Sequence, residues 1–407
     1  MTINRPFPRF FAYVGYAAFS LLATAALLEL LACATSSAYR RIHPDSERDS
    51  ITNNPVFSKY SWAPELHREQ KLRLAAQSRN YVPFRIWGLT EWHGNFMNND
   101  ATEFGVVRRT INLRRPGCER LPKANIWIFG GSALYGTGVP DSLTLPSYLS
   151  RELNANHCVE LTNFGVEGYV NDQEMIVLES ELKAGHQPDT VIFYDGFNDG
   201  LVGTVDPGIP GVHIGYSTIK ARLEGSVIAR LDFLRRSCAA QLATAPILKL
   251  FHRRLRPVPA DAAIGAKAIA TVENYEQNLN IARALGKSRG FRVYAFWQPV
   301  VVYGHKPLAL SERLLVDASS DPTTPFQAMI PVYEEAQRRA ASAAEFVFLG
   351  NLFDTVQEPV YFDWVHLSPR GNEIAAHAVA EYITAHAGVI GQDEDGVRNG
   401  DLSTHQP

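Results

Sequence analysis

The sequence predicts an α/β fold in which a parallel central sheet is covered by helices on both faces. From Asn125 onward, short runs of β-branched and aromatic residues alternate with longer segments of helical periodicity. The strand-like runs read "NIWIFGG", "VELTNFG", "TVIFYDG", "RVYAFWQP" and "EFVFLGN". Strands that alternate with helices are typical of parallel sheets with helices on both faces. At 407 residues with 46% hydrophobic composition, the chain can bury one large domain and carry appendages.

The first element is an apolar N-terminal stretch. Residues 10–28, "FFAYVGYAAFSLLATAALL", carry no charge and are long enough for one membrane span. Arg5 and Arg9 precede the stretch and favour a cytoplasmic N-terminus, although two arginines that follow it weaken this orientation. Because "LLAC" ends at Cys33, processing to a lipid anchor is an alternative. Both interpretations predict a membrane anchor in residues 1–36 and a catalytic domain outside the cytoplasm, in the periplasm or at the cell surface.

The rest of the chain divides by composition. Residues 37–120 are polar and aromatic, so we expect a linker and an irregular extension that packs on the main domain. The main domain is expected over residues 121–387, with an insertion at about 201–270, and the polar tail 388–407 is expected to be disordered. Between residues 220 and 256 the insertion has nine Lys or Arg and only two acids. It is expected to form a lid whose basic face either meets anionic headgroups or an acidic polymer, or is simply solvated.

Composition also excludes several functions. With 39 basic and 42 acidic residues, the chain has no electrostatic case for binding nucleic acid. No two of its four cysteines have metal-ligand spacing, and we expect neither a metal nor an organic cofactor. In an oxidising compartment Cys118 and Cys158 could be bridged, while free buried thiols are an equal alternative.

A serine directly follows two glycines at the end of the first predicted strand of the domain, in "IFGGSALYGTG". A mononucleotide loop would need a Lys-Ser or Lys-Thr pair after Gly136, and a dinucleotide loop would need glycine where Asp141 stands. The α/β-hydrolase elbow needs glycine where Leu134 stands. Ser132 is therefore predicted to be a nucleophile at the carboxyl end of a strand, where open α/β sheets bind their ligands.

A serine nucleophile needs a base, a group that orients the base, and donors for the oxyanion. In "DWVH", Asp363 precedes His366 by three residues, so the carboxylate can accept the Nδ1 proton and leave Nε2 as the base. Ser368 and Pro369 are typical of an N-cap and a first helical residue, which places the pair at a loop–helix junction. The segments "TVIFYDGFNDG" and "TNFGVEGYVNDQE" end strands in turns that offer an asparagine amide and glycine N–H groups.

Four blocks, taken in order, resemble the SGNH hydrolase family, also called the GDSL esterases and lipases. They are "FGGSALYG", "NFGVEG", "GFND" and "DWVH", and the likeness covers residues from about 124 to 387. The serine block reads Gly-Gly-Ser in place of Gly-Asp-Ser, which leaves the nucleophile in place. The extension around "GNFMNNDATEFGVVRRT" also resembles what precedes the domain in membrane-anchored bacterial members, but no catalytic residue is assigned there.

The resemblance implies a three-layer α/β/α, flavodoxin-like fold, and it implies a role for each site residue. Ser132 would be the nucleophile, His366 the general base, and Asp363 the residue that orients the base. The implied oxyanion hole consists of the backbone N–H groups of Ser132 and Gly168 and the side-chain amide of Asn198. Gly165 is a weaker alternative to Gly168, and Asp199 would support the asparagine turn.

The function expected from these features is that of a membrane-tethered extracytoplasmic serine esterase. It would remove a short acyl group, most plausibly acetyl, from a carbohydrate or another ester through an acyl-enzyme. One alternative is an O-acyltransferase of cell-surface polysaccharide that uses the same triad. Another is a polysaccharide-binding protein that keeps the fold without catalysis. The sequence leaves the oligomeric state open.

Overall fold

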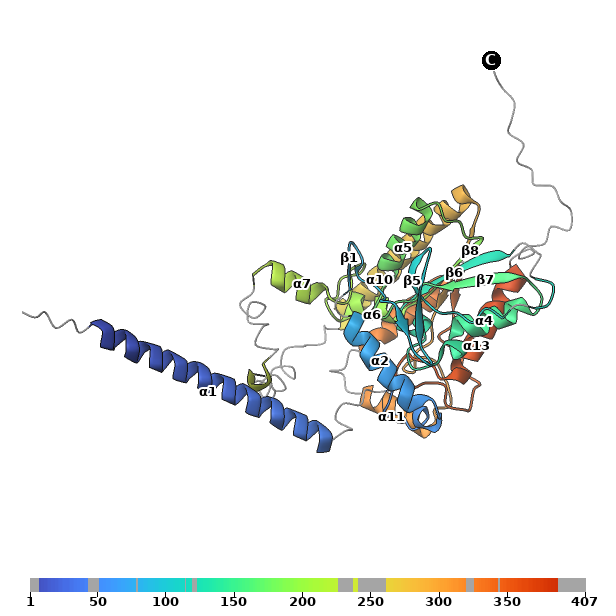
Figure 1. Cartoon of the computed structure of the whole chain (residues 1–407). Coiled ribbons are helices and arrows are strands. Elements are labelled where there is room, and N and C mark those ends of the chain that lie inside the picture. The colour runs from blue at the N-terminus through green and yellow to red at the C-terminus, as the bar shows by residue number, and fades with distance from the viewer. Residues whose placement is uncertain are drawn as a thin grey trace, which may run out of the picture. The chain divides into compact units, whose positions relative to one another are not determined.

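The computed structural model describes residues 7–42, 51–77, 80–113, 115–118, 123–225, 237–240, 261–319, 326–342 and 345–386. These belong to two compact units (Figure 1). The smaller unit combines Met1–Asp49 with Gly215–Val258, and the larger combines Ser50–Ile214 with Pro259–Pro407. The predicted tail 388–407 and much of the basic insertion lie outside the described residues.

The smaller unit contains the long helix α1, Phe7–Ile42, and the short helix α7, Tyr216–Leu223. Within the described part of the chain, Ala12–Ala38 of α1 is the one stretch long and apolar enough to cross a membrane. The 36 residues of α1 rise by about 54 Å, which exceeds the hydrocarbon thickness of a bilayer, about 30 Å. The helix ends at Ile42 and not at the predicted boundary of residue 36.

A disulfide in the same unit joins Cys33 of α1 to Cys238 of the insertion. One turn earlier, Glu29 accepts hydrogen bonds from Ser237 Oγ at 2.6 Å and from the N–H of Ala239 at 3.2 Å. Among the described residues, Glu29 and these two cysteines also form the one cluster of potential metal ligands. Because the two sulfurs are bonded to each other, they are not thiolate ligands.

The larger unit is built on an eight-stranded sheet of order β10-β9-β8-β6-β7-β5-β4-β3. Its five parallel strands are the five predicted ones: β6 Ala124–Gly130, β7 Val159–Asn163, β8 Thr190–Asp195, β9 Arg292–Trp297 and β10 Phe346–Phe348. Numbered along the chain, these strands lie in the order 2-1-3-4-5, which is the flavodoxin-like order. The predicted parallel core is confirmed.

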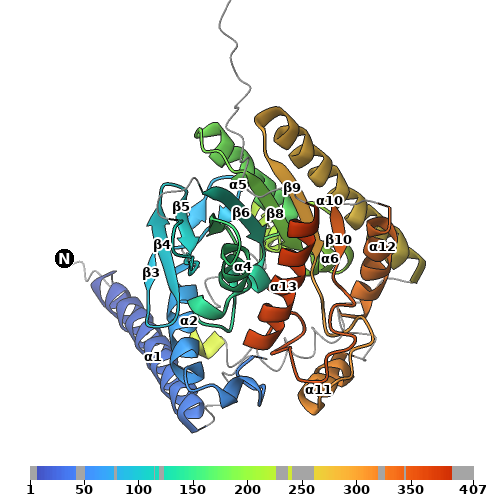
Figure 2. The ribbon, with the colours of Figure 1, turned by 90° about the vertical axis from the view of Figure 1, so that its right-hand side faces the viewer.

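Helices cover the sheet on both faces, which gives three layers (Figure 2). On one face α4, Leu145–Asn154, packs against α13, Pro369–His386. On the other, α10, Asp261–Arg289, packs against α5 Asn171–Lys183, α6 Phe197–Thr204 and α12 Ile330–Ala340. The connection from β6 to β7 runs through α4, and the connection from β7 back to β8 runs through α5. These crossovers lie on opposite faces, so the topological switch point lies between β6 and β8, at their carboxyl ends.

The region before β6 is more regular than the sequence suggested. It contains the helix α2, Ala63–Gln77, and a separate two-stranded sheet of β1 Tyr81–Val82 and β2 Ile86–Trp87. Strands β3 Trp92–His93, β4 Asn98–Thr102 and β5 Gly105–Arg108 extend the large sheet in antiparallel fashion. The sheet is therefore mixed at this edge and not parallel throughout. The sequence of β4, "NNDAT", has no apolar alternation, which is why the pattern gave no strand there.

Shorter elements complete the larger unit. They are η2 Phe57–Lys59, α3 Ser132–Tyr135, η3 Asp141–Leu143, α11 Leu310–Ser319 and η5 Gln327–Met329. Cys118 and Cys158 are joined in a disulfide, which is one of the two states that the sequence left open. Because Cys158 directly precedes β7, this bridge fastens the segment before β6 to the start of β7.

Candidate active site

The two glycines before Ser132 are explained by the close approach of β6 and β8 at their carboxyl ends. A Cβ atom on Gly130 would lie 2.6 Å from the carbonyl oxygen of Tyr194. A Cβ atom on Gly131 would lie 2.4 Å from Nδ2 of Asn198. The first contact is with backbone of β8 and requires glycine at Gly130, whereas the second is with the end of the Asn198 side chain, which would have to shift for a larger residue at Gly131. The turn leaves Ser132 as the first residue of α3.

The side chains of Ser132, His366 and Asp363 form one continuous hydrogen-bonded chain. His366 Nε2 lies 2.8 Å from Ser132 Oγ, and His366 Nδ1 lies 2.7 Å from Asp363 Oδ2. The other carboxylate oxygen of Asp363 accepts the backbone N–H groups of Val365, at 2.9 Å, and of His366, at 2.8 Å. The structure thus brings together three residues that the sequence places 234 and three positions apart.

The loop that carries His366 is fixed by its own backbone. The N–H of Phe362 donates to the carbonyl of His366 at 2.8 Å, and the N–H of Ser368 donates to the carbonyl of Val360 at 2.7 Å. Helix α13 begins at Pro369, and Ser368 Oγ accepts the N–H of Gly371 at 3.3 Å. The predicted N-cap and first helical residue are therefore confirmed, and the imidazole is mounted on a rigid junction.

Asp363 is held as a carboxylate by its surroundings. Burial acts to raise the pKa of Asp363, but the charge and hydrogen bond of His366 and the two backbone N–H groups outweigh burial. The net result is a pKa below the ordinary value for aspartate. An ionised Asp363 fixes the imidazole tautomer with its proton on Nδ1, which leaves Nε2 able to accept the proton of Ser132.

The expected oxyanion donors lie around the same end of the sheet. Asn198 Nδ2 donates to the carbonyl of Tyr169 at 2.7 Å, and because an amide nitrogen has two protons, one donor remains. Gly168 has φ of +78°, a left-handed conformation that favours glycine. The N–H of Gly165 donates to Asn163 Oδ1 at 2.8 Å, so Gly165 is engaged and Gly168 is the better donor.

The hollow beside Ser132 is very small. Its volume is about 10 Å³, and its lining includes Tyr169, Phe197, Asn198 and Gln298. A cavity of this size holds roughly one water-sized group.

A buried cluster of two arginines packs against α3, the helix that begins at Ser132. We define this arginine cluster as Arg73, Arg108, Tyr135, Asp141 and Glu167. Arg73, on α2, pairs with both carboxylate oxygens of Glu167, one of them at 2.5 Å. Arg108, on β5, pairs with Asp141 at 2.8 Å. The two guanidinium groups lie 4.7 and 4.8 Å from the ring centroid of Tyr135, the last residue of α3. Since Glu167 directly precedes Gly168, the cluster connects the extension to both the nucleophile helix and the glycine turn.

A second cluster, the carboxyl cluster, consists of Glu174, Asp195 and Asp199 and lies beneath the Asn198 turn. Burial, followed by the negative charges of Asp195 and Asp199, raises the pKa of Glu174 well above its ordinary value. Burial likewise raises the pKa of Asp199, to about 7. Asp199 Oδ1 accepts the N–H of Asn171 at 3.0 Å, and Asp195 Oδ2 accepts from Asn171 Nδ2 at 3.2 Å. Asp199 thus holds the turn to the start of α5, as expected of a supporting residue.

Comparison with known proteins adds structural likenesses. No family model and no curated protein matches the sequence. A solved structure of a member of the lipolytic protein G-D-S-L family from Veillonella parvula is similar at 13% identity, with a TM-score of 0.34, over 64% of this chain and 98% of that chain. An acetylxylan esterase from Geobacillus stearothermophilus is similar at 15% identity, with a TM-score of 0.34, over 65% of this chain and 95% of that chain.

Both of these solved structures are less than 25% identical to this chain.

Sequence reasoning missed the arginine cluster. Its members are spread from α2 to the turn after β7, so no local motif unites them. The segment "GNFMNND" is the part of the sequence that points to the cluster, because it contains Asn98 and Asn99. Asn98 and Asn99 of that segment contact the cluster: Asn98 Nδ2 donates to Asp141 at 2.6 Å, and Asn99 Oδ1 accepts from the hydroxyl of Tyr135 at 2.9 Å.

Proposed function

We propose that this protein is a serine esterase of the SGNH type that removes a short acyl group, with acetyl the best candidate, from a carbohydrate or another ester. The observation that carries the proposal is the chain of hydrogen bonds from Asp363 through His366 to Ser132 Oγ. A hydroxyl so placed loses its proton to the base as it attacks a carbonyl carbon.

The reaction follows from the positions of these groups. Ser132 Oγ attacks the ester carbonyl while His366 Nε2 takes the hydroxyl proton. The N–H groups of Ser132 and Gly168 and the second amide proton of Asn198 would stabilise the oxyanion. Collapse breaks the ester bond, and His366 returns the proton to the departing alcohol. A water molecule, deprotonated by His366, then releases the acid and restores Ser132.

The small hollow beside Ser132 supports a short acyl group. Its volume of about 10 Å³ fits a group about the size of a water molecule, which favours a small acyl group there. The acetylxylan esterase among the similar structures agrees with acetyl as the leading candidate, but the alcohol part of the ester is not determined by the fold.

We further propose that α1 spans a membrane and that the larger unit lies outside the cytoplasm. Two disulfides are typical of an oxidising compartment. The sulfur of Cys33 is bonded to Cys238, and a sulfur in a disulfide cannot carry a lipid thioether. The disulfide therefore favours a transmembrane anchor over the lipid anchor that the sequence left as an alternative.

Labelling of the full-length protein with a fluorophosphonate probe, followed by peptide mapping, tests the proposal. We expect modification of Ser132, and we expect it to disappear in the variants Ser132→Ala and His366→Ala. Free acetate released from an acetylated oligosaccharide would then establish hydrolysis, whereas acetyl found on an added acceptor sugar would establish transfer. A folded wild-type protein that is neither labelled nor active on esters would contradict the proposal and favour a binding function.

A further inference from the structure

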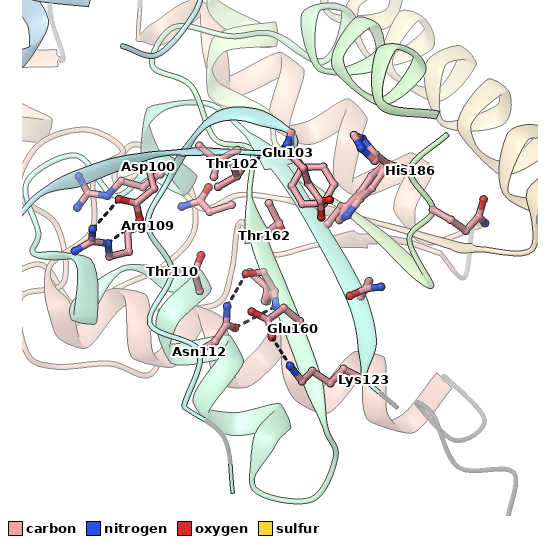
Figure 3. Close-up of a pocket in the computed structure, with 18 residues that line it drawn as sticks. Asp100, Thr102, Glu103, Arg109, Thr110, Asn112, Lys123, Glu160, Thr162 and His186 are labelled. Atoms are coloured by element: carbon pink, nitrogen blue, oxygen red, sulfur yellow. Dashed lines mark hydrogen bonds and ion pairs between the residues drawn. The ribbon is translucent and has the colours of Figure 1, made fainter. Parts of the chain in front are cut away.

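A large hollow lies away from Ser132. It has a volume of about 870 Å³ and opens between the β4–β5 hairpin, the strands β6 and β7, and the segment after α5 (Figure 3). Its lining includes none of Ser132, Asp363 and His366. Ligand sites in proteins have volumes of about 300 to 1,000 Å³, and this hollow falls within that range.

The hollow exists because β5 and β7 separate. The two strands pair at one position, Arg108 with Asn163, and then diverge. Beyond that point, the side chain of Asn112 takes the place of a paired strand. Its Oδ1 accepts the N–H of Leu161 at 3.1 Å, and its Nδ2 donates to the carbonyl of Leu161 at 3.0 Å. Because the strand edge is occupied there, the hollow is not shaped for an added peptide strand.

At the rim, Arg109 and Lys123 are each paired with an acid, whereas Glu103 makes no ion pair within the described part of the chain. Arg109 forms two hydrogen bonds with the carboxylate of Asp100, at 2.6 and 2.7 Å, and Lys123 Nζ lies 3.4 Å from Glu160 Oε2. Figure 3 shows these two pairs at separate places around the hollow. An anionic ligand would need unpaired cations, and a cationic ligand would need a cluster of unpaired acids. The lining therefore favours a ligand without net charge.

Two polar side chains line the hollow, Asn125 on β6 and Thr162 on β7. An amide and a hydroxyl supply both donors and acceptors, a combination that complements sugar hydroxyls.

The floor provides an apolar surface beside these groups. The half-buried rings of Phe104 and His186 lie 4.9 Å apart, measured between centroids, and Trp127 packs beneath Phe104 as a buried core residue. A sugar ring has an apolar face and a polar rim, so it matches a floor of aromatic rings surrounded by hydroxyl and amide groups. We propose that this hollow binds a neutral oligosaccharide, independently of the Ser132 site.

Binding of unacetylated glycans to the full-length protein tests this inference. A glycan array that carries neutral and acidic oligosaccharides is incubated with wild-type protein in a detergent without a sugar headgroup, because alkyl glycosides could occupy the site. We expect the protein to be retained by neutral glycans. We expect no retention that requires an acidic glycan. The dissociation constant of the best neutral glycan is then measured by calorimetry.

Two variants and a matched control assign that binding to the hollow. Thr162→Val and Asn125→Ala each remove one hydrogen-bonding group and should weaken binding about fivefold, the loss of one hydrogen bond. Thr218→Val, on α7 in the smaller unit, makes the same chemical change elsewhere and should leave binding unchanged. Fluorophosphonate labelling of Ser132 should be equal in all of these proteins, which separates this inference from the proposed esterase activity.

The outcomes are distinct. Weaker binding in both hollow variants, with unchanged binding in Thr218→Val, supports the inference. Equal binding in the hollow variants and the wild type would overturn it, since the glycan would then bind elsewhere. Absence of retention on every neutral glycan, or retention on acidic glycans alone, would overturn it as well.

Discussion

The arginine cluster packs against α3 and the carboxyl cluster lies at the Asn198 turn, and the two clusters accommodate buried charge in different ways. In the arginine cluster, each cation has a carboxylate partner: Arg73 pairs with Glu167, and Arg108 with Asp141. In the carboxyl cluster, three acids lie together, and burial raises the pKa of each. The first cluster therefore pairs each acid with a cation, although burial still raises the pKa of Asp141, and the second holds protons because it lacks a counter-charge.

The difference shows that the glycine turn and the asparagine turn are held in place by two different kinds of interaction. Ion pairs hold the extension to the nucleophile helix and the glycine turn, and they depend on both partners being present. Protonated carboxyls hold the asparagine turn to α5, and they depend on pH. Variants that remove charge should therefore damage the first cluster and spare the second.

The largest effect is expected for Arg73→Met, which leaves Glu167 without its cation in a mostly buried place. Removing one partner of a buried pair should lower the free energy of unfolding by about 3 kcal/mol. Urea unfolding of the full-length protein in detergent, followed by tryptophan fluorescence, measures the loss. The control is Arg109→Met, because Arg109 pairs with Asp100 while 39% and 29% of their side chains are exposed. That variant should lose less than about 1 kcal/mol, and equal losses would break the comparison.

A smaller effect, with a distinct pH dependence, is expected for Asp199→Asn. The folded-state pKa of Asp199 is about 7, above the unfolded value of about 3.9, so the folded protein binds more protons between these values. Wild-type stability contributed by Asp199 is thus full below about pH 4 and is lost as pH rises toward 7. The neutral Asn variant should gain stability relative to wild type as pH rises through that range. Unfolding curves that differ by a constant amount at every pH would contradict this assignment.

The smallest effect is expected for Glu174→Gln. Burial raises the pKa of Glu174 well above its ordinary value, and neither of its carboxyl oxygens has a hydrogen-bond partner among the described residues, so a glutamine replaces one neutral group by another of similar shape. The free energy of unfolding at neutral pH should change by less than about 1 kcal/mol. Glu167→Gln is the matched control, since the same change there removes the charge that Arg73 requires. If Glu174→Gln costs as much as Glu167→Gln, the carboxyl cluster is ionised and the comparison fails.

The parallel core and the placement of Ser132, Asp363 and His366 could be predicted because short local segments of the sequence specify each of them. Apolar runs predict the five parallel strands, and a spacing of three residues on one loop places Asp363 beside His366. The roles of the site residues remain proposals, but the expected side chains do lie together. The sequence already favoured Gly168 over Gly165, and the structure adds that the N–H of Gly165 donates to Asn163 Oδ1.

The edge of the sheet and the arginine cluster could not be foreseen, because they depend on contacts between distant polar residues. Arg73 and Glu167 are 94 positions apart, and nothing near either residue specifies the other. Strands β3, β4 and β5 are short and lack apolar alternation, so tertiary pairing forms them. The same holds for the bridge between Cys33 and Cys238, which lie 205 positions apart.

The bridge between Cys33 and Cys238 makes a closed covalent ring of everything between them, including α2 and all strands from β1 to β8. A protease that cuts once inside this ring opens it but does not divide the molecule, since both products stay joined through sulfur. Release of the larger unit from α1 by a cut inside this ring would therefore take two events, the cut in the backbone and reduction of the disulfide. Electrophoresis of the nicked protein with and without a reductant would display the two events separately.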